Sequence, residues 1–325
     1  MGILLGFIAA IGWGAGDFFV RGATHVIGTY RSVIYMQLFG LLGLSILLVG
    51  SGYFNHSLAQ VGIWPWLWGL AAAALNVGSS LALYQALKIG VVSIMSPVVA
   101  SYAVVTVILS FLSGESISLI HAIGMGVVLI GIVCAVIVIP RLSRVSRISR
   151  REKYINVIDG VVDVDSSVSA ESENVQDTHE RQPFLKRLPR GLLIALGAAV
   201  GYGITFWILG FRVTPYLGGI APVWLIRLST PIMLTLAAPL LRQGVAIPRG
   251  RVWWTLAIAG ILDTTAYISY TIGVTVAQVA VMSVLASLYS AVTVLLASIF
   301  LHERLHWNQW LGIGAILVGV GLINL

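Results

Sequence analysis

The residues that could do chemistry in this chain lie mostly within long apolar segments. Arg227 and Asp263 are the most informative of them, because a charge inside such a segment usually faces a partner or a water-filled cavity. Counted at about 1.5 Å per residue along helices that run in opposite directions, the two lie at similar depth, so we expect an ion pair. Two interpretations stay open: the pair only locks two helices together, or it serves a solute-binding site.

Two tyrosines favour the second interpretation. Tyr267 and Tyr270 follow Asp263 by four and seven residues, so they share its helical face. A polar and aromatic stripe within an apolar helix is more typical of a cavity wall than of a lipid-facing surface. Asn76 and Tyr84 are expected on the opposite wall, on a helix that an internal repeat pairs with the helix of Asp263.

Asp17 and Trp13 lie one turn apart on the first apolar segment and complete the set of predicted cavity residues. Asp17 has two interpretations: an i,i+4 ion pair with Arg21 at the helix end, which we favour, or a contact with solute. Five further residues can line a cavity or form ordinary hydrogen bonds between helices: Gln37, Gln85, Tyr102, Tyr202 and Tyr289.

Four residues are expected to have structural roles. Glu115 and Glu303 end matching apolar segments, where a carboxylate opposes the helix dipole. We therefore predict that each accepts hydrogen bonds from the N–H groups that open the next helix. Pro97 and Pro231 leave a carbonyl one turn earlier without its helical partner, so we expect both to bend their helices.

Residues 302–306 read His-Glu-Arg-Leu-His, which matches the H-E-x-x-H pattern of zinc metalloproteases. Two histidines at this spacing can hold zinc while the glutamate activates water. However, no His or acid follows His306 to supply a third ligand, and the matching stretch of the repeat keeps Glu115 without either histidine. We therefore predict no metal, no cofactor and no catalytic residue.

The composition places these residues in a membrane. Of the 325 residues, 58% are hydrophobic and only 10% are charged, whereas soluble domains carry about 25% charged residues. The mean hydropathy is +0.97. The net charge of +7 does not indicate nucleic-acid binding, because the basic residues gather in loops, where they orient membrane helices.

An internal repeat organises the chain, since residues 75–133 align with residues 262–320. The fold class we predict is all-α integral membrane, with ten transmembrane helices arranged as two inverted five-helix repeats. An odd number of helices per repeat inverts the second copy, and solute sites in such proteins lie between the halves. The predicted helices are 3–20, 32–50, 63–87, 91–113, 118–139, 191–209, 220–241, 252–273, 276–300 and 307–324.

A polar linker, residues 140–190, joins the repeats 1–139 and 191–325 and is predicted to be disordered. Its basic start can lie as a helix on an anionic membrane surface or act as a solvated stop signal. Ten of the nineteen Lys and Arg are in the linker, and Arg212 is the one basic residue expected on the opposite side of the membrane. The positive-inside rule therefore puts the linker in the cytoplasm and both termini outside a cell (plasma) membrane.

Several short segments match those of a known family. They are the opening IGWGAGDFF, the Glu115 and Glu303 junctions, and the following segments GMGVVLIG and GIGAILVG, of which the junctions and the glycine-rich segments occur in both halves. With them the chain resembles the EamA-type transporters of the drug/metabolite transporter (DMT) superfamily, over nearly all of its length except residues 140–190. The resemblance implies ten helices, a central cavity and alternating access without ATP. The long linker and the outside termini depart from well-known members.

We predict a secondary transporter, not an enzyme, that moves a small organic metabolite or drug-like solute across the membrane by alternating access. Its partners are the solute, the lipid bilayer and, if Asp263 is the coupling site, a proton; either a monomer or a homodimer fits. Two alternatives stay open. One is a membrane zinc peptidase that uses His302 and His306, and the other is a sensor or scaffold that acts through the basic linker.

Overall fold

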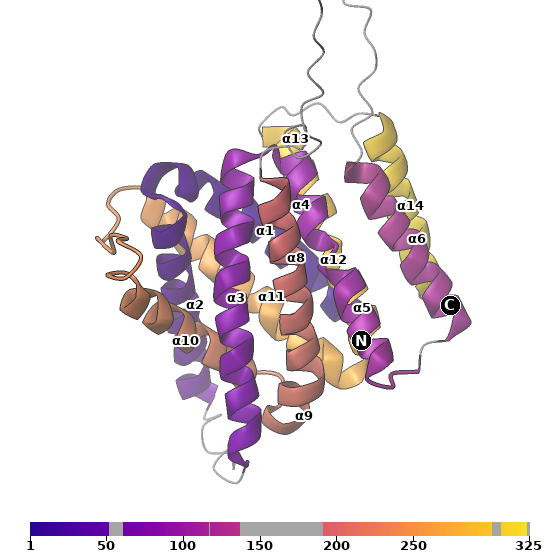
Figure 1. Cartoon of the computed structure of the whole chain (residues 1–325), viewed down its shortest axis with the longest axis horizontal. Coiled ribbons are helices and arrows are strands. Elements are labelled where there is room, and N and C mark those ends of the chain that lie inside the picture. Colours follow the sequence, from indigo (N-terminus) through magenta and orange to yellow (C-terminus); the bar gives the residue numbers. More distant parts are fainter. Residues whose placement is uncertain (52–60, 117, 137–190, 301–306, 324–325) are drawn as a thin grey trace, which may run out of the picture. The chain divides into compact units, whose positions relative to one another are not determined.

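The computed structural model describes residues 1–51, 61–116, 118–136, 191–300 and 307–323. All regular elements within these ranges are helices (Figure 1). The predictions for the linker 140–190, for Glu303 and for the His-Glu-Arg-Leu-His stretch 302–306 lie outside the described residues.

The helices follow the apolar segments, because lipid offers the backbone no partner and only internal hydrogen bonds can satisfy it. The first half holds α1 (Gly2–Ile27), α2 (Thr29–Ser51), α3 (Ile63–Ile89), α4 (Val92–Ala100), α5 (Tyr102–Leu112) and α6 (Leu119–Val136). The second half holds α8 (Leu192–Ile208), the π-helical turn η4 (Leu209–Val213), α9 (Thr214–Leu217), α10 (Ala221–Ala237), α11 (Val252–Val276), α12 (Val279–Ser287), α13 (Tyr289–Phe300) and α14 (Trp307–Ile323).

Within the described residues, 7 helical stretches are long and apolar enough to cross a membrane. They are Gly2–Ile27, Thr29–Gly50, Ile63–Ile89, Ile94–Leu112, Leu192–Leu217, Val252–Val276 and Val279–Phe300. Two shorter apolar stretches, Leu119–Gly131 and Ala221–Ala237, accompany them. The all-helical prediction is confirmed for these residues, and the number of ten spans stays a prediction.

Two predicted helix ends fall well short of the observed ones. α1 continues to Ile27, past the predicted end at residue 20, and the helical path of α8 continues through η4 and α9 to Leu217. Arg21 and Arg212 lie shortly after the two predicted ends. A long basic side chain can reach the membrane surface from inside a helix, so it does not have to end one.

The predicted helices 91–113 and 276–300 are each interrupted, and the interruptions lie at matching positions of the repeat. Ser101 separates α4 from α5, and Leu288 separates α12 from α13. At both places the backbone forms a tighter turn: the Ser101 N–H donates to the Val98 carbonyl at 3.2 Å, and the Leu288 N–H donates to the Leu285 carbonyl at 3.2 Å. Such a turn within a helical run often marks a hinge.

Proline does not account for these interruptions. Pro97 lies inside α4, but the matching position in α12 is Val284, and both helical runs are interrupted. Pro231 lies inside α10, which continues past it without a break. The bends expected at the two prolines stay predictions.

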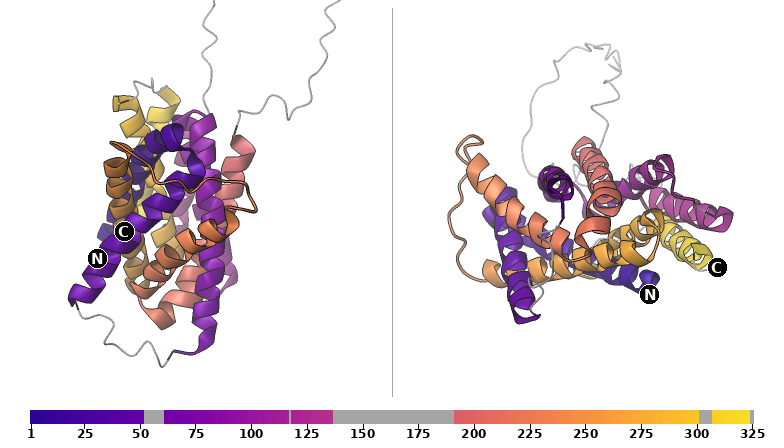
Figure 2. Two further views of the ribbon diagram at one scale, coloured as in Figure 1. Left: turned by 90° about the vertical axis from the view of Figure 1, so that its left-hand side faces the viewer. Right: turned by 90° about the horizontal axis from the view of Figure 1, so that it is seen from below.

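The two halves pack on each other, and the first helix of each half packs against helices of the other half. α1 packs against α11 and α13 of the second half, and α8 packs against α3 and α5 of the first (Figures 1 and 2). Thr293 Oγ1 donates to the Gly14 carbonyl at 3.2 Å, and the matching Thr106 Oγ1 donates to the Gly203 carbonyl at 3.1 Å. A Cβ atom added to either glycine would lie 2.5 Å from the Cβ of a valine on the facing helix. These glycines therefore set how closely the halves approach.

Glu115 caps a helix of the other half. Its Oε1 accepts from the Val279 N–H at 2.7 Å, and its Oε2 accepts from the Ala280 N–H at 3.1 Å. Both N–H groups open α12, where a carboxylate also complements the helix dipole. Glu115 thus caps a helix N-terminus as expected, but the helix is not α6, the next in sequence. That part of the prediction is wrong, because the packing of the halves brings α12 closer to the carboxylate.

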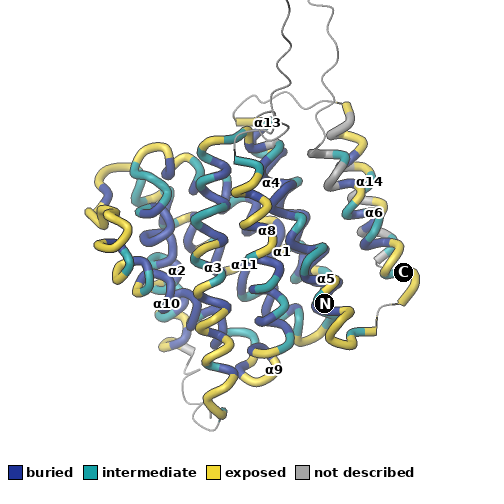
Figure 3. Tube along the Cα trace, viewed as in Figure 1, coloured by how far each residue is buried: buried dark blue, intermediate teal, exposed yellow. Residues whose placement is uncertain are grey.

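Residues in the interior of the helix bundle are buried, and exposed residues lie mostly on its outer faces and at its ends (Figure 3). Large exposed apolar side chains include Leu4, Ile46, Trp64, Phe111 and Leu236. Buried polar and charged side chains include Asp17, Gln37, Asn76, Arg227 and Asp263. This distribution suits lipid around the helices and places the groups capable of chemistry at the centre.

Candidate functional site

Side chains from both halves enclose a small central cavity. The space open to water is about 30 Å³, which is room for about two water molecules. The wall consists of Trp13, Asp17, Met36, Ser80, Leu83, Tyr84, Tyr102, Tyr202, Phe206, Asp263, Tyr267 and Tyr289. These residues come from α1, α2, α3 and α5 of the first half and from α8, α11 and α13 of the second.

The expected ion pair between α10 and α11 is present. Arg227 Nη1 lies 2.7 Å from Asp263 Oδ2, and both side chains are buried. The same nitrogen donates to Gln37 Oε1. The guanidinium carbon lies 4.9 Å from the centre of the Tyr267 ring. A carboxylate, an amide and an aromatic face therefore all stabilise the charge of Arg227, and Asp263 presents the pair to the cavity.

Tyr267 links this pair to the first half. Its hydroxyl donates to Asn76 Oδ1 on α3. Asn76 is fully buried, and its amide nitrogen has no hydrogen-bond partner among the described groups. A buried donor without a partner costs about 1–3 kcal/mol. A bound water or solute that accepts a hydrogen bond from the Asn76 amide would remove this cost.

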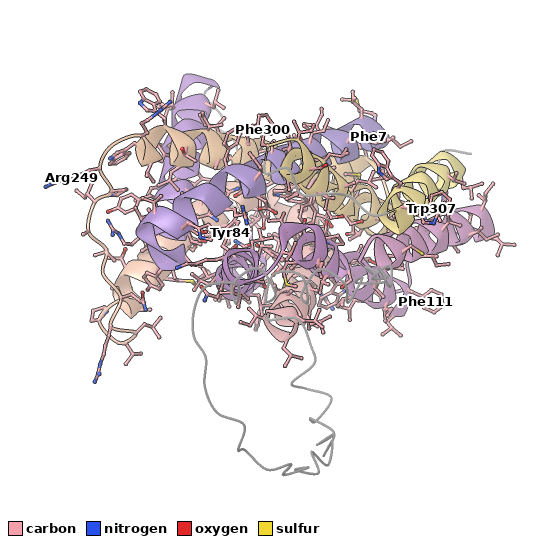
Figure 4. The ribbon with its side chains drawn as sticks, turned by 90° about the horizontal axis from the view of Figure 1, so that it is seen from above. Phe7, Tyr84, Phe111, Arg249, Phe300 and Trp307 are labelled. Atoms are coloured by element: carbon pink, nitrogen blue, oxygen red, sulfur yellow. The ribbon has the colours of Figure 1, made fainter. Side chains whose placement is uncertain are left out.

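Asp17 contacts Tyr84 and not Arg21. The Tyr84 hydroxyl donates to Asp17 Oδ1 at 3.1 Å, and Figure 4 shows the Tyr84 side chain among the helices. Arg21 is partly exposed, and its Nε donates to the Leu87 carbonyl at 3.4 Å. The favoured prediction of an Asp17–Arg21 pair is therefore wrong. Asp17 faces the interior, whereas Arg21 reaches outward to the end of α3.

Aromatic rings form much of the cavity wall. Trp13 meets the Tyr267 ring edge to face with ring centres 5.0 Å apart, and its centre lies 5.2 Å from that of Phe206. Edge-to-face and tilted pairs of this kind add to the stability of a packed aromatic cluster. The cluster fixes the tryptophan on α1 between two helices of the second half.

Two matching tyrosines on the cavity wall each contact the other half. Tyr102 donates to the Ser283 carbonyl, and Tyr289 donates to the Ser96 carbonyl, both at 3.4 Å. Their rings stack with centres 6.3 Å apart. Each tyrosine directly follows one of the helix interruptions, so a change of angle at either interruption would move a wall residue.

The structure brings the predicted cavity residues together in two layers. Those on the wall are Trp13, Asp17, Tyr84, Asp263 and Tyr267. Those in contact with the wall from behind are Asn76, Arg227 and Tyr270. Among the further candidates, Tyr102, Tyr202 and Tyr289 are on the wall and Gln37 contacts Arg227. Gln85 instead accepts a hydrogen bond from Thr29 at 3.0 Å.

Sequence reasoning missed Met36, Leu83 and Phe206 on the wall. An apolar residue in an apolar helix carries no signal of its own. The repeat did offer a signal for Phe206, which follows Gly203 by three residues, as Asp17 follows Gly14. Matching positions of the two halves therefore face the same cavity, with a carboxylate at Asp17 and an aromatic ring at Phe206.

Residues 1–137 and 189–325 match the family model described as the EamA-like transporter family. The chain belongs to this family. Membership confirms the resemblance seen in the matching segments and makes the chain a multi-pass membrane protein of the transporter class. It does not favour the zinc-peptidase alternative. Among the residues that the structure describes, no group of three or more His, Cys, Asp or Glu is placed to hold a metal ion.

A solved structure, described only as the crystal structure of a protein, has a similar fold. It superimposes with a TM-score of 0.66 at 16% sequence identity, over 99% of this chain and 95% of that chain. Similarity at this identity concerns the fold alone. No curated protein matches the sequence.

Proposed function

We propose that the protein is a secondary transporter that carries a small organic solute by alternating access, with ten transmembrane helices in two inverted five-helix repeats. The cavity built from both halves carries this proposal. Its volume of about 30 Å³ is far below the roughly 300–1,000 Å³ of sites that hold drug-sized ligands. The halves must therefore separate before a solute can enter.

The paired interruptions support such a motion. Ser101 and Leu288 occupy matching positions, and each is followed by a wall tyrosine. If one interruption bends, one side of the cavity opens while the matching contact on the other side stays closed. Equivalent hinges in the two inverted copies would serve alternating access, in which one repeat moves against the other.

A proton is the proposed coupling ion. Two carboxylates line the cavity, but Arg227 neutralises Asp263, whereas the one hydrogen bond described for Asp17 comes from Tyr84. Asp17 is therefore a better candidate for the coupling site than Asp263, which the sequence had suggested. Asp17→Asn is expected to abolish pH-driven uptake while the folded protein stays in the membrane. Unchanged pH-driven uptake would assign the coupling elsewhere.

The transport proposal is tested by uptake and efflux screens across metabolite classes with purified protein in lipid vesicles. Alternating access is tested by Ser80→Cys in a Cys134→Ser background, since Ser80 is on the wall and Cys134 is the chain's one native cysteine. Small thiol reagents should reach position 80 from either side of the membrane, and a transported solute should protect it. Reactivity from one side only would contradict alternating access.

The linker 140–190 is proposed to lie in the cytoplasm and to join the repeats 1–139 and 191–325 without taking part in transport. Deletion of residues 141–185 should leave transport intact. Loss of transport after this deletion would favour the sensor or scaffold alternative. Stoichiometric zinc in the purified protein would revive the peptidase alternative at residues 302–306.

A further inference from the structure

We infer that the cavity is built for an organic cation, meaning a protonated or quaternary amine with an apolar body. The inference rests on the proposed transport function and names the class of solute. It follows from two independent properties of the wall, which are its net charge and its aromatic surface.

The charges at the cavity do not balance. Asp17 and Asp263 line the wall, and Arg227 is the one buried basic side chain among the described residues. Because Arg227 is paired with Asp263 at 2.7 Å, the carboxylate of Asp17 is left without a positive partner. A buried charge needs a partner of opposite sign to offset its lost hydration. The cavity therefore favours an occupant with one positive charge.

The aromatic surface selects an organic cation over an inorganic one. Trp13, Tyr84, Tyr102, Tyr202, Phe206, Tyr267 and Tyr289 make up 7 of the 12 wall residues. The faces of such rings attract ammonium groups, and several rings together form the kind of cage that holds alkylated ammonium ligands. A small metal cation instead prefers a shell of oxygen ligands, and the carboxylates here are outnumbered by rings.

The position of Arg227 argues against an organic anion. Arg227 is not part of the wall. Its Nη1 is engaged by both Asp263 and Gln37, and its Nε and Nη2 are buried without a hydrogen-bond partner among the described groups. A carboxylate in the cavity would share it with Asp17 and Asp263, which are both on the wall, whereas the guanidinium of Arg227 is not. Repulsion between two carboxylates is strong in a cavity that holds little water.

The test uses four solutes that share a phenyl ring and differ in charge. They are 2-phenylethylamine, 2-phenylethanol, 3-phenylpropanoate and phenylalanine, which are cationic, neutral, anionic and zwitterionic at neutral pH. Binding to the purified full-length protein is measured by isothermal titration calorimetry, and translocation is measured in proteoliposomes. We expect the amine to bind at least about tenfold more tightly than the other three, which is about 1.4 kcal/mol.

Two variants with matched controls assign the binding to the wall. Asp17→Asn keeps an acceptor for Tyr84, so it should fold, but it should weaken amine binding by about 10- to 100-fold, the range of a charged hydrogen bond. Asp17→Glu should restore most of the affinity. Trp13→Leu should weaken binding by up to about 30-fold, whereas Trp254→Leu should not, because Trp254 is 75% exposed and not on the wall.

The outcomes separate this inference from the transport proposal. Preferred binding and translocation of the alcohol, the propanoate or phenylalanine would overturn the cation assignment and leave transport standing. Binding of the amine without translocation in vesicles would support the cation site and count against transport. If none of the four binds, or if Asp17→Asn binds the amine as well as the native protein does, the cation assignment is wrong.

Discussion

At the scale of single residues, the buried pair of Arg227 and Asp263 can be structural, functional or both. The sequence left these interpretations open. Its geometry locks α10 to α11, and its carboxylate also faces the cavity. Removing one partner leaves a buried charge unpaired, which is far more costly than removing both. The two interpretations therefore make different predictions for single and double variants.

Arg227→Met and Asp263→Leu should each lower the free energy of unfolding by about 3–5 kcal/mol. The double variant should lose less than the sum, by about 0.5–3 kcal/mol, because no unpaired charge remains. Denaturant unfolding in detergent, followed by circular dichroism, measures these values. Additive losses would contradict direct coupling, and native transport by the double variant would make the pair purely structural.

A second prediction concerns the hydrogen bond from Tyr84 to Asp17. Tyr84→Phe removes a donor from a buried carboxylate and should destabilise the protein by about 1.5–3 kcal/mol, as expected for a bond to a charged group. The matched control is Tyr216→Phe, because Tyr216 is 61% exposed. The control should change stability by less than about 0.5 kcal/mol. Equal effects of the two variants would show that the bond contributes nothing specific.

At the scale of helices, Glu115 caps α12, a helix that is distant from it in sequence. Both of its oxygens accept N–H groups at the start of α12. Glu115→Ala should cost about 0.5–2 kcal/mol, the range for loss of a helix cap. Glu115→Gln keeps one acceptor oxygen, so its stability should lie between that of the native protein and that of Glu115→Ala. Thermal unfolding in detergent ranks the three proteins, and an Ala variant as stable as the native protein would dismiss the cap.

The close approach of α1 to α13 is a further property of helices that can be measured. Gly14→Ala should destabilise by about 1–3 kcal/mol, because the new Cβ would lie 2.5 Å from the Val292 Cβ. Gly197→Ala, on α8, is the control, since nothing lies within 4 Å of a Cβ there. The control should gain up to about 1 kcal/mol from helix propensity. In thermal unfolding, Gly14→Ala should lower the melting temperature, and Gly197→Ala should leave it unchanged or raise it. A higher melting temperature for Gly14→Ala would contradict the close packing.

At the scale of the whole molecule, the proposed orientation predicts which segments meet the cytoplasm. In a Cys134→Ser background, Gly244→Cys should react with a membrane-impermeant maleimide only after cells are permeabilised, because basic residues surround it in sequence. Tyr216→Cys, near Arg212, should react in intact cells. Both positions are exposed, so access alone does not distinguish them. The reverse pattern would invert the orientation.

The sequence predicts those parts of the molecule that depend on local pattern. Apolar segments predict the helices, and depth along two of them predicts the pair of Arg227 and Asp263. Contacts between the halves have no local pattern, so the cap on α12 and the contact of Asp17 with Tyr84 could not be derived. The interruptions at Ser101 and Leu288 also escaped prediction, because neither a glycine nor a shared proline marks them.

The exchanged packing of the halves also has a consequence for how the protein is made. α1 ends at Ile27, while its partner α11 begins only at Val252. At about 5–20 residues per second, the ribosome needs on the order of 10–45 s to synthesise the segment between them. During that delay α1 carries Asp17 in the bilayer without the second half. Tyr84 is synthesised 67 residues after Asp17 and is its first partner. This contact within the first half therefore gives the carboxylate a hydrogen bond before α11 is made.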